Sequence, residues 1–283
     1  MPKKIGLALG GGGAKGLAHI GIIKAFKRAG IPIDFIAGTS MGALVGAWYA
    51  ATEDIEVLEE QFLKIKTRDI FPIKEILKKK KGGLFHGDSA AKLLEKNFGK
   101  LKFSDCKIPF SAVATDVKNG DTVVINRGAL SDAVKASIAL PVIFGPAQVG
   151  KQLLIDGGFS NPVPADVVKN MGAEFVIAVD VSSKWTSSPD EITSIRDIFS
   201  ILSDALSVIE YQLAKAPLKM ADVILRPPVL HFGWLEFGRA GEIIRIGTEE
   251  GELRAKEIRQ GAGIPEPPKT LSDKFFDFLA GKD

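Results

Sequence analysis

The sequence has few of the residues from which disulfide frameworks and metal centres are built. It contains one cysteine, Cys106, and three histidines, His19, His86 and His231. A single cysteine excludes an intramolecular disulfide framework and a Cys-based zinc cluster. Because the three histidines are scattered along the chain, a His-rich metal site is disfavoured as well. We therefore predict no bound metal and no other cofactor.

An excess of charge and a long apolar run are also missing. The 37 basic and 34 acidic residues leave a formal net charge of +3. This charge is too small and too dispersed to indicate a nucleic-acid partner, so none is predicted. No stretch approaches the roughly 18 consecutive apolar residues of a membrane-spanning helix. With 46% hydrophobic residues in 283, the composition is typical of a globular chain that buries a sizeable core, which excludes disorder and fibres.

The first residues imitate a secretory signal, because Lys3-Lys4 precedes the apolar run 5–9. That run is too short for a signal and stops at four glycines. We expect a cytoplasmic location, with peripheral membrane contact as an alternative. Two segments could make such contact, the lysines of 78–81 and the amphipathic segment 274–279. The first is more often a solvated loop, and the second is more often a tail docked on its own domain.

Strands and helices are expected to alternate along the chain. Strands are expected at 4–9, 33–37, 110–115, 122–126, 152–155, 174–181 and 221–225. Helices are expected at 17–29, 41–51, 163–171, 192–215 and 239–260, with a charged and largely helical stretch at 53–100. This alternation predicts an α/β fold, a three-layer sandwich whose mainly parallel central sheet is flanked by helices. We expect one domain over residues 1–283, with a motif-bearing core at about 5–182 and a C-terminal helical portion at about 190–283.

A glycine-rich loop follows the first expected strand, at residues 10–16. Glycines there let backbone N–H groups converge at a helix N-terminus, which predicts an anion site. Gly11, Gly13 and Gly16 also spell G-x-G-x-x-G, so a dinucleotide-binding protein is an alternative. That alternative requires an acidic residue at the end of the second strand, whereas Asp34 stands at its start.

A second motif, G-x-S-x-G, occupies residues 38–42 at the end of the second expected strand. In this motif the serine, here Ser40, stands at a strained turn between strand and helix, and Gly38 and Gly42 remove Cβ atoms that would clash there. A serine nucleophile needs a base. Only His231 follows late enough for the order serine, acid, histidine. Its apolar neighbours carry no motif, so a site without histidine is the competing interpretation.

A third motif ends the strand at 152–155, where Asp156 leads into Gly157 and Gly158. Alone, this is an ordinary turn. The three motifs together resemble the patatin-like phospholipase family, whose hallmarks are a G-G-G-x-K/R-G loop, a G-x-S-x-G elbow and a D-G-G/A turn. Residues 136–146 and 156–164 are similar to the family's stretch around its catalytic aspartate. The resemblance covers about 5–182, and the last hundred residues match only loosely.

The resemblance implies a serine lipid acyl hydrolase of the phospholipase A, lysophospholipase or carboxylesterase type, acting on a lipid or ester through an acyl-enzyme. It implies a catalytic dyad of Ser40 and Asp156, in which the aspartate is the base. The oxyanion hole would be formed by the N–H groups of Gly11, Gly12 and Gly13. The remaining motif residues would support these groups: Lys15, Gly16, Gly38, Gly42, Gly157 and Gly158. Lys15 either adds positive charge to the loop or is solvated in the first helical turn.

Other functions remain open on the sequence alone. The scaffold could carry a catalytically weak regulatory or adaptor protein, and the same chemistry could transfer the acyl group to an alcohol. An acyl chain needs an apolar channel, for which the sequence offers the cluster Phe232, Trp234, Leu235 and Phe237. Core packing explains such a cluster at least as often.

Overall fold

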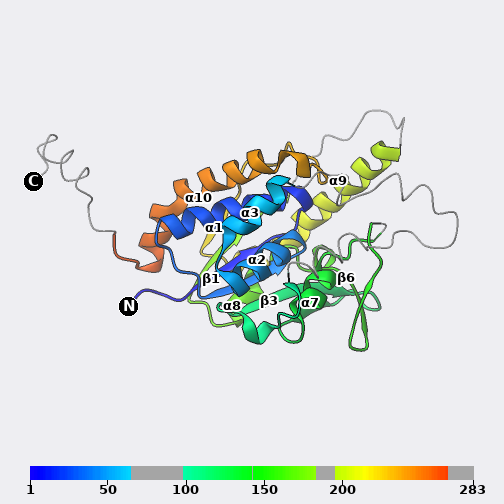
Figure 1. The fold of residues 1–283 in the computed structure, drawn as a ribbon, viewed down its shortest axis with the longest axis horizontal. Coiled ribbons are helices and arrows are strands. Elements are labelled where there is room, and N and C mark those ends of the chain that lie inside the picture. Colours follow the sequence, from blue (N-terminus) through cyan, green and yellow to red (C-terminus); the bar gives the residue numbers. More distant parts are fainter. Residues whose placement is uncertain (65–97, 142, 183–194, 267–283) are drawn as a thin grey trace, which may run out of the picture.

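The computed structural model describes residues 1–64, 98–141, 143–182 and 195–266 (Figure 1). Its strands are β1 (Ile5–Leu9), β2 (Phe35–Thr39), β3 (Phe110–Asp116), β4 (Thr122–Ile125), β5 (Ala147–Val149), β6 (Gln152–Asp156), β7 (Phe175–Val179) and β8 (Val223–Leu225). Its α-helices are α1 (Ala18–Arg28), α2 (Met41–Thr52), α3 (Ile55–Lys64), α7 (Leu130–Ser137), α8 (Ala165–Asn170), α9 (Ile195–Ala214) and α10 (Ala240–Ala262). Short 3₁₀ turns are η1 (Gly13–Leu17), η2 (Phe103–Asp105), η3 (Gly157–Phe159), η4 (Pro217–Met220) and η5 (Phe237–Arg239).

The strands form one sheet in the order β5-β6-β3-β2-β1-β7-β8, and β4 also pairs with β3. The central strands β3, β2, β1, β7 and β8 run parallel to one another. Strands β4, β5 and β6 add antiparallel pairs at one side. The predicted strands are confirmed within a few residues, and the predicted mainly parallel sheet is confirmed. The short edge strand β5 and the helix α7 were not predicted from the sequence.

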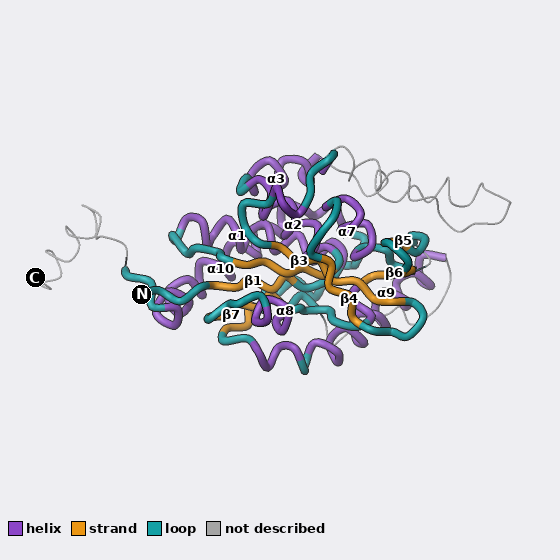
Figure 2. The backbone as a smooth tube through the Cα atoms, turned by 90° about the horizontal axis from the view of Figure 1, so that it is seen from below, coloured by secondary structure: helices purple, strands orange, loops and turns teal. Residues whose placement is uncertain are grey.

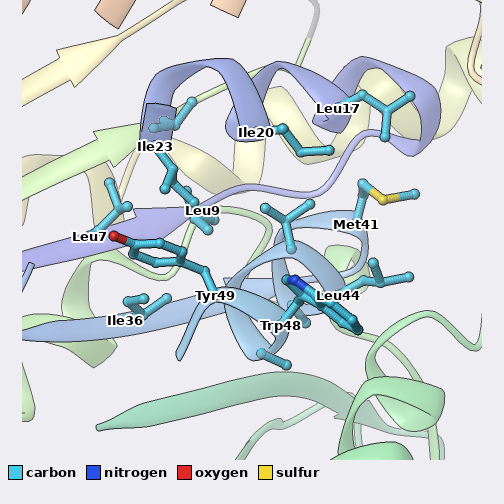
Figure 3. Packing of buried hydrophobic residues seen from close by; sticks show 14 of the residues in the cluster. Leu7, Leu9, Leu17, Ile20, Ile23, Ile36, Met41, Leu44, Trp48 and Tyr49 are labelled. Carbon is cyan, nitrogen blue, oxygen red and sulfur yellow. The ribbon is translucent and has the colours of Figure 1, made fainter. Parts of the chain in front are cut away.

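Successive side chains of β1 alternate between large and small, and they point to opposite faces of the sheet, each of which has its own hydrophobic core. Leu7 and Leu9 of β1 belong to a large core shared with α1, α2 and α10. Ala8, which points the other way, belongs to a smaller core shared with α8 and η4. Figure 2 shows α1, α2 and α3 on one side of the strands and α8 on the other. Figure 3 shows the larger core, in which Ile20 of α1 lies with residues of β1 and α2. The predicted three-layer sandwich is therefore confirmed.

The first and last described helices, α1 and α10, run side by side (Figure 1). Their backbones approach closely because each contributes a glycine to the contact. A Cβ atom on Gly21 of α1 would lie 2.0 Å from the carbonyl oxygen of Ile244. A Cβ atom on Gly247 of α10 would lie 2.0 Å from the carbonyl oxygen of Ala18. The C-terminal part of the chain is therefore docked on the helix that follows the glycine-rich loop.

Several expectations fall beyond the described residues. The basic segment 78–81 and the amphipathic segment 274–279 both lie outside them. Of the helical stretch expected at 53–100, α3 confirms the first part, and residues 65–97 lie outside the description. No helix in the described ranges combines the length and the apolar character needed to cross a membrane. The single domain and the cytoplasmic location stay predictions.

We expect Gly247→Ala to lower the free energy of unfolding by about 1–3 kcal/mol, because the new methyl group would push α10 away from α1. Urea denaturation measures the change. Gly145→Ala is the matched control, since a Cβ atom there would meet nothing within 4 Å. Equal stability of the two variants would contradict the close packing of the two helices.

Candidate active site

Ser40 occupies a strained turn between β2 and α2. Its φ of 54° and ψ of −122° are rare for a residue other than glycine. The flanking glycines permit the turn, because a Cβ atom on Gly38 would lie 2.4 Å from the carbonyl oxygen of Gly42. A Cβ atom on Gly42 would lie 2.1 Å from the carbonyl oxygen of Leu9. The backbone around Ser40 therefore has the geometry that the G-x-S-x-G motif predicts.

The order and register of the strands place Asp156 next to Ser40. Strand β3 lies between β2 and β6, and Asp156 is the last residue of β6. The register of β3 with both neighbours brings Asp156 to the level at which β2 ends. Ser40 Oγ donates a hydrogen bond to Asp156 Oδ2 at 2.7 Å. The other carboxylate oxygen, Oδ1, accepts a hydrogen bond from the Gly158 N–H at 2.8 Å. Two residues 116 positions apart thus form one hydrogen-bonded pair.

The pKa of Asp156 is raised by its surroundings. The side chain is almost wholly buried, and this desolvation raises its pKa from the ordinary value of 3.8 to about 6. The hydrogen bonds from Gly158 and Ser40 stabilise the charged form but do not cancel the effect of burial. An aspartate with an ordinary pKa is a poor base near neutrality. Burial therefore makes Asp156 a stronger base, and with a pKa of about 6 the carboxylate is still mostly ionised at pH 7.

Two hydroxyl groups hold the backbone of this pair in place. The Ser40 N–H donates to Ser137 Oγ at 2.9 Å, and the Ser137 hydroxyl donates to the carbonyl oxygen of Val113 at 2.5 Å. Thr115 Oγ1 donates to the carbonyl oxygen of Asp156 at 2.9 Å. No role was predicted for Ser137, since nothing in its spacing along the sequence relates it to Ser40.

The glycine-rich loop offers fewer oxyanion donors than the sequence analysis predicted. The Gly11 N–H already donates to the carbonyl oxygen of Pro162 at 2.9 Å. The prediction that Gly11 contributes a donor therefore does not fit this geometry. Gly12 and Gly13 have φ values of 147° and 57°, which favour glycine. Within the described part of the chain, neither of their N–H groups has a hydrogen-bond acceptor. These two N–H groups remain the candidate oxyanion donors.

Trp234 and His19 fix the loop from two sides. A Cβ atom on Gly13 would lie 2.5 Å from the carbonyl oxygen of Trp234 and 2.6 Å from its ring. The same carbonyl accepts the N–H of Ala14 at 2.8 Å. On the other side, His19 Nε2 lies 2.8 Å from the carbonyl oxygen of Gly10. The loop therefore rests on one aromatic residue from the C-terminal part of the chain and one buried histidine.

The apolar cluster that the sequence offered as an acyl channel is part of the core. Phe232, Trp234 and Phe237 are buried in the large core, and Leu235 packs against it. His231 is exposed, and its ring lies against that of Phe232. The Ser40 hydroxyl bonds to Asp156, so the geometry gives no support to a histidine base.

The dinucleotide alternative also lacks support. Asp34 Oδ2 accepts the N–H of Ile5 at 2.7 Å, at the start of β1. Asp34 is thus engaged at the opposite end of the strands from the glycine-rich loop. In the described residues, no group of three or more His, Cys, Asp or Glu side chains could hold a metal ion.

Lys15 is buried instead of solvated, so the solvated alternative is wrong. Its side chain is 4% exposed, and its Nζ donates to Ser207 Oγ of α9 at 3.2 Å. Burial lowers the pKa of Lys15, while Glu210 in its ionised form, Asp204 and Asp180 oppose this effect. Helix α9 therefore contributes a polar patch against the glycine-rich loop, which the sequence analysis did not anticipate.

Comparisons with known proteins identify the family of the chain. A family model described as patatin-like phospholipase matches residues 7–169, which include all three motifs. The chain belongs to the patatin-like phospholipase family. The match ends before α9 and α10, so the contacts of Lys15 with Ser207 and of Gly13 with Trp234 join the family's matched region to residues beyond it.

Two curated relatives match this patatin-like chain over nearly its whole length. It is 32% identical over 306 residues to neuropathy target esterase sws of Drosophila melanogaster, covering 95% of this chain and 21% of that protein. It is 30% identical over 297 residues to lysophospholipase NTE1 of Pyricularia oryzae, covering 96% of this chain and 20% of that protein. The chain thus spans about a fifth of the length of these relatives.

A solved structure shows the same fold. VipD from Legionella pneumophila superimposes with a TM-score of 0.52 at 12% identity, over 92% of this chain and 67% of that one.

We expect the stability of this patatin-like chain to depend on pH through His19. Burial lowers the pKa of His19 to about 4, whereas the unfolded chain protonates histidine near pH 6.5. Between these values the unfolded state binds a proton that the folded state does not. His19 therefore lowers the free energy of unfolding by about 2 kcal/mol as the pH falls from 7 to 5.

Urea denaturation of the wild type and of His19→Gln at both pH values isolates this contribution. Asp156 and Glu210, whose pKa values are raised, act in the opposite direction in both proteins and cancel in the comparison. The variant is expected to lose less stability on acidification than the wild type. The same loss in both proteins would show that His19 does not remain neutral.

Proposed function

We propose that this chain is a serine lipid acyl hydrolase, with Ser40 as the nucleophile and Asp156 as the general base. The observation that carries the proposal is the 2.7 Å hydrogen bond from Ser40 Oγ to Asp156 Oδ2, made at a strained turn in a buried site. Membership of the patatin-like phospholipase family supports it. Relatives named as a lysophospholipase and an esterase favour an ester of a fatty acid as substrate.

In the proposed mechanism, the same groups serve both halves of the reaction. Ser40 Oγ attacks the ester carbonyl as its proton passes to Asp156, and the N–H groups of Gly12 and Gly13 stabilise the oxyanion. When the intermediate collapses, Asp156 gives the proton to the departing alcohol, and the acyl group stays on Ser40. Water then loses a proton to Asp156 and attacks the acyl-enzyme. The fatty acid leaves, and Ser40 recovers its proton from Asp156.

Lysophospholipid is the first natural substrate to test. The product alcohol would then be the glycerol-phosphate headgroup portion of the lipid. An alcohol in place of water in the second half of the reaction would make the same site an acyltransferase. A weakly active adaptor is the alternative from another class, and the serine-dependent assay below distinguishes it.

We expect Ser40→Ala and Asp156→Asn each to lower kcat/KM by at least about a thousandfold, because each removes a group that no other residue replaces. The assay is hydrolysis of p-nitrophenyl esters of increasing chain length, followed by lysophosphatidylcholine. His231→Ala is the control and should keep its activity within about twofold. Well-folded wild type without serine-dependent hydrolysis would favour the adaptor.

The rate should also follow the ionisation of Asp156. Protonated Asp156 cannot accept the proton of Ser40, so kcat/KM should rise with pH and reach half its plateau near pH 6. The measurement is kcat/KM of one soluble ester between pH 4.5 and 7.5. A midpoint near pH 4, the ordinary value for aspartate, would show that burial does not tune this base.

A further inference from the structure

A third carboxyl group lies at the dyad, that of Glu210 on α9. The side chain of Glu210 is 1% exposed. A Cβ atom on Gly158 would lie 2.4 Å from Glu210 Oε1 and 3.2 Å from Asp156 Oδ1. A Cβ atom on Gly11 would lie 3.2 Å from Glu210 Oε1 and 3.4 Å from the Cβ atom of Ser40. Glu210 thus fills space that two motif glycines leave open, beside both members of the dyad.

One oxygen of the Glu210 carboxyl group makes no hydrogen bond to the described residues. Glu210 Oε2 is buried and has no hydrogen-bond partner in the part of the chain that the structure describes. The charge of Lys15 acts on Glu210, but its Nζ donates to Ser207. Among the described residues there is no ion pair between Lys15 and Glu210. A buried polar atom without a partner destabilises a protein. A carboxyl oxygen without a partner, on a side chain that packs against the glycines next to the dyad, is available to a ligand.

The surroundings keep Glu210 uncharged at neutral pH. Burial raises its pKa to about 8, and the charges of Asp156 and Asp180 act in the same direction, while Lys15 opposes them. Asp204, one turn and a half earlier on α9, acts on Lys15. At pH 7 Asp156 is therefore ionised while Glu210 keeps its proton. Two carboxyl groups whose pKa values are pushed apart in one site are typical of a base and a donor.

We propose that Glu210 is a further catalytic residue, whose carboxyl O–H donates a hydrogen bond to an oxygen of the tetrahedral intermediate formed on Ser40. The inference rests on the proposed hydrolase function. The donor adds to the N–H groups of Gly12 and Gly13 as the electron pair of the carbonyl moves onto oxygen. Glu210 keeps its proton throughout, so the proton transfers between Ser40 and Asp156 are unchanged.

The test is the pH dependence of kcat and KM for ester hydrolysis between pH 5 and 10, in the wild type, Glu210→Gln and Glu210→Ala. The wild type should lose activity above about pH 8, because ionised Glu210 no longer donates and its charge opposes the oxyanion. Glu210→Gln keeps an N–H donor that cannot ionise, so it should retain activity within about tenfold at pH 7 and lose the alkaline decline. Glu210→Ala should lower kcat about a hundredfold, with little change in KM.

A control variant separates this effect from a general loss of charge. Glu249 is an exposed glutamate of α10 that pairs with Arg245, and Glu249→Gln should keep the wild-type alkaline decline. The same decline in Glu210→Gln as in the wild type, or wild-type kcat in Glu210→Ala, would overturn the proposal. If Glu210→Ala does not fold, as judged by circular dichroism, the profile of Glu210→Gln decides.

The two proposals fail in different ways. Ser40-dependent hydrolysis with an unaltered Glu210→Gln profile would overturn the role of Glu210 alone. If the wild type hydrolyses no ester, the rate at which a fluorophosphonate phosphonylates Ser40 with loss of fluoride replaces turnover, because attack at phosphorus also places negative charge on an oxygen bound to the attacked atom. Labelling should then decline above about pH 8 in the wild type and not in Glu210→Gln. An identical decline in both would overturn the role of Glu210.

Discussion

The turn at Ser40 is the constraint on which the rest of the site depends. A residue with a side chain is held at positive φ where β2 ends and α2 begins, and such backbone strain persists only when the surroundings impose it. Here those surroundings are the close approach of Gly42 to β1 and the hydrogen bond from the Ser40 N–H to Ser137. From this fixed backbone the Ser40 hydroxyl donates to the carboxylate of Asp156.

The same site makes the fold less stable than it could be. Burying Asp156 and Glu210 raises the pKa of each, so ionising them in the folded state is unfavourable. Both groups bind protons more tightly in the folded than in the unfolded state, and their contribution to stability falls as the pH rises from about 4 to 8. A chain selected for stability alone would replace them with apolar residues. Their burial is therefore best explained by the chemistry that we propose.

The three motifs could be read from the sequence because each is local. A loop of glycines, an elbow and a turn each span a few residues, and each follows an expected strand. That the three meet at one site depends on the order and register of the strands, which the structure shows. The contacts that complete the site are not local. The burial of Lys15 depends on Ser207, 192 positions later, and the loop rests on Trp234 from beyond the matched region. The engagement of the Gly11 N–H depends on Pro162, which no spacing rule connects to it.

The sequence carries a weak indication that Glu210 is buried. Leu206, Glu210 and Ala214 recur every four residues on α9 and are all buried, so a glutamate stands where the helical period expects an apolar side chain. A charged residue on the buried face of an amphipathic helix indicates either a partner or a site. The sequence alone could not say which, because the groups that surround it come from β6, from η1 and from the residues after β7.

Mass-spectrometric mapping of a fluorophosphonate adduct tests the dyad most directly. We expect one modified residue in the wild type, Ser40. Labelling should be at least about a hundredfold slower in Asp156→Asn, because the serine then lacks its base. Modification of another residue, or labelling of Asp156→Asn at the wild-type rate, would contradict a nucleophile activated by Asp156.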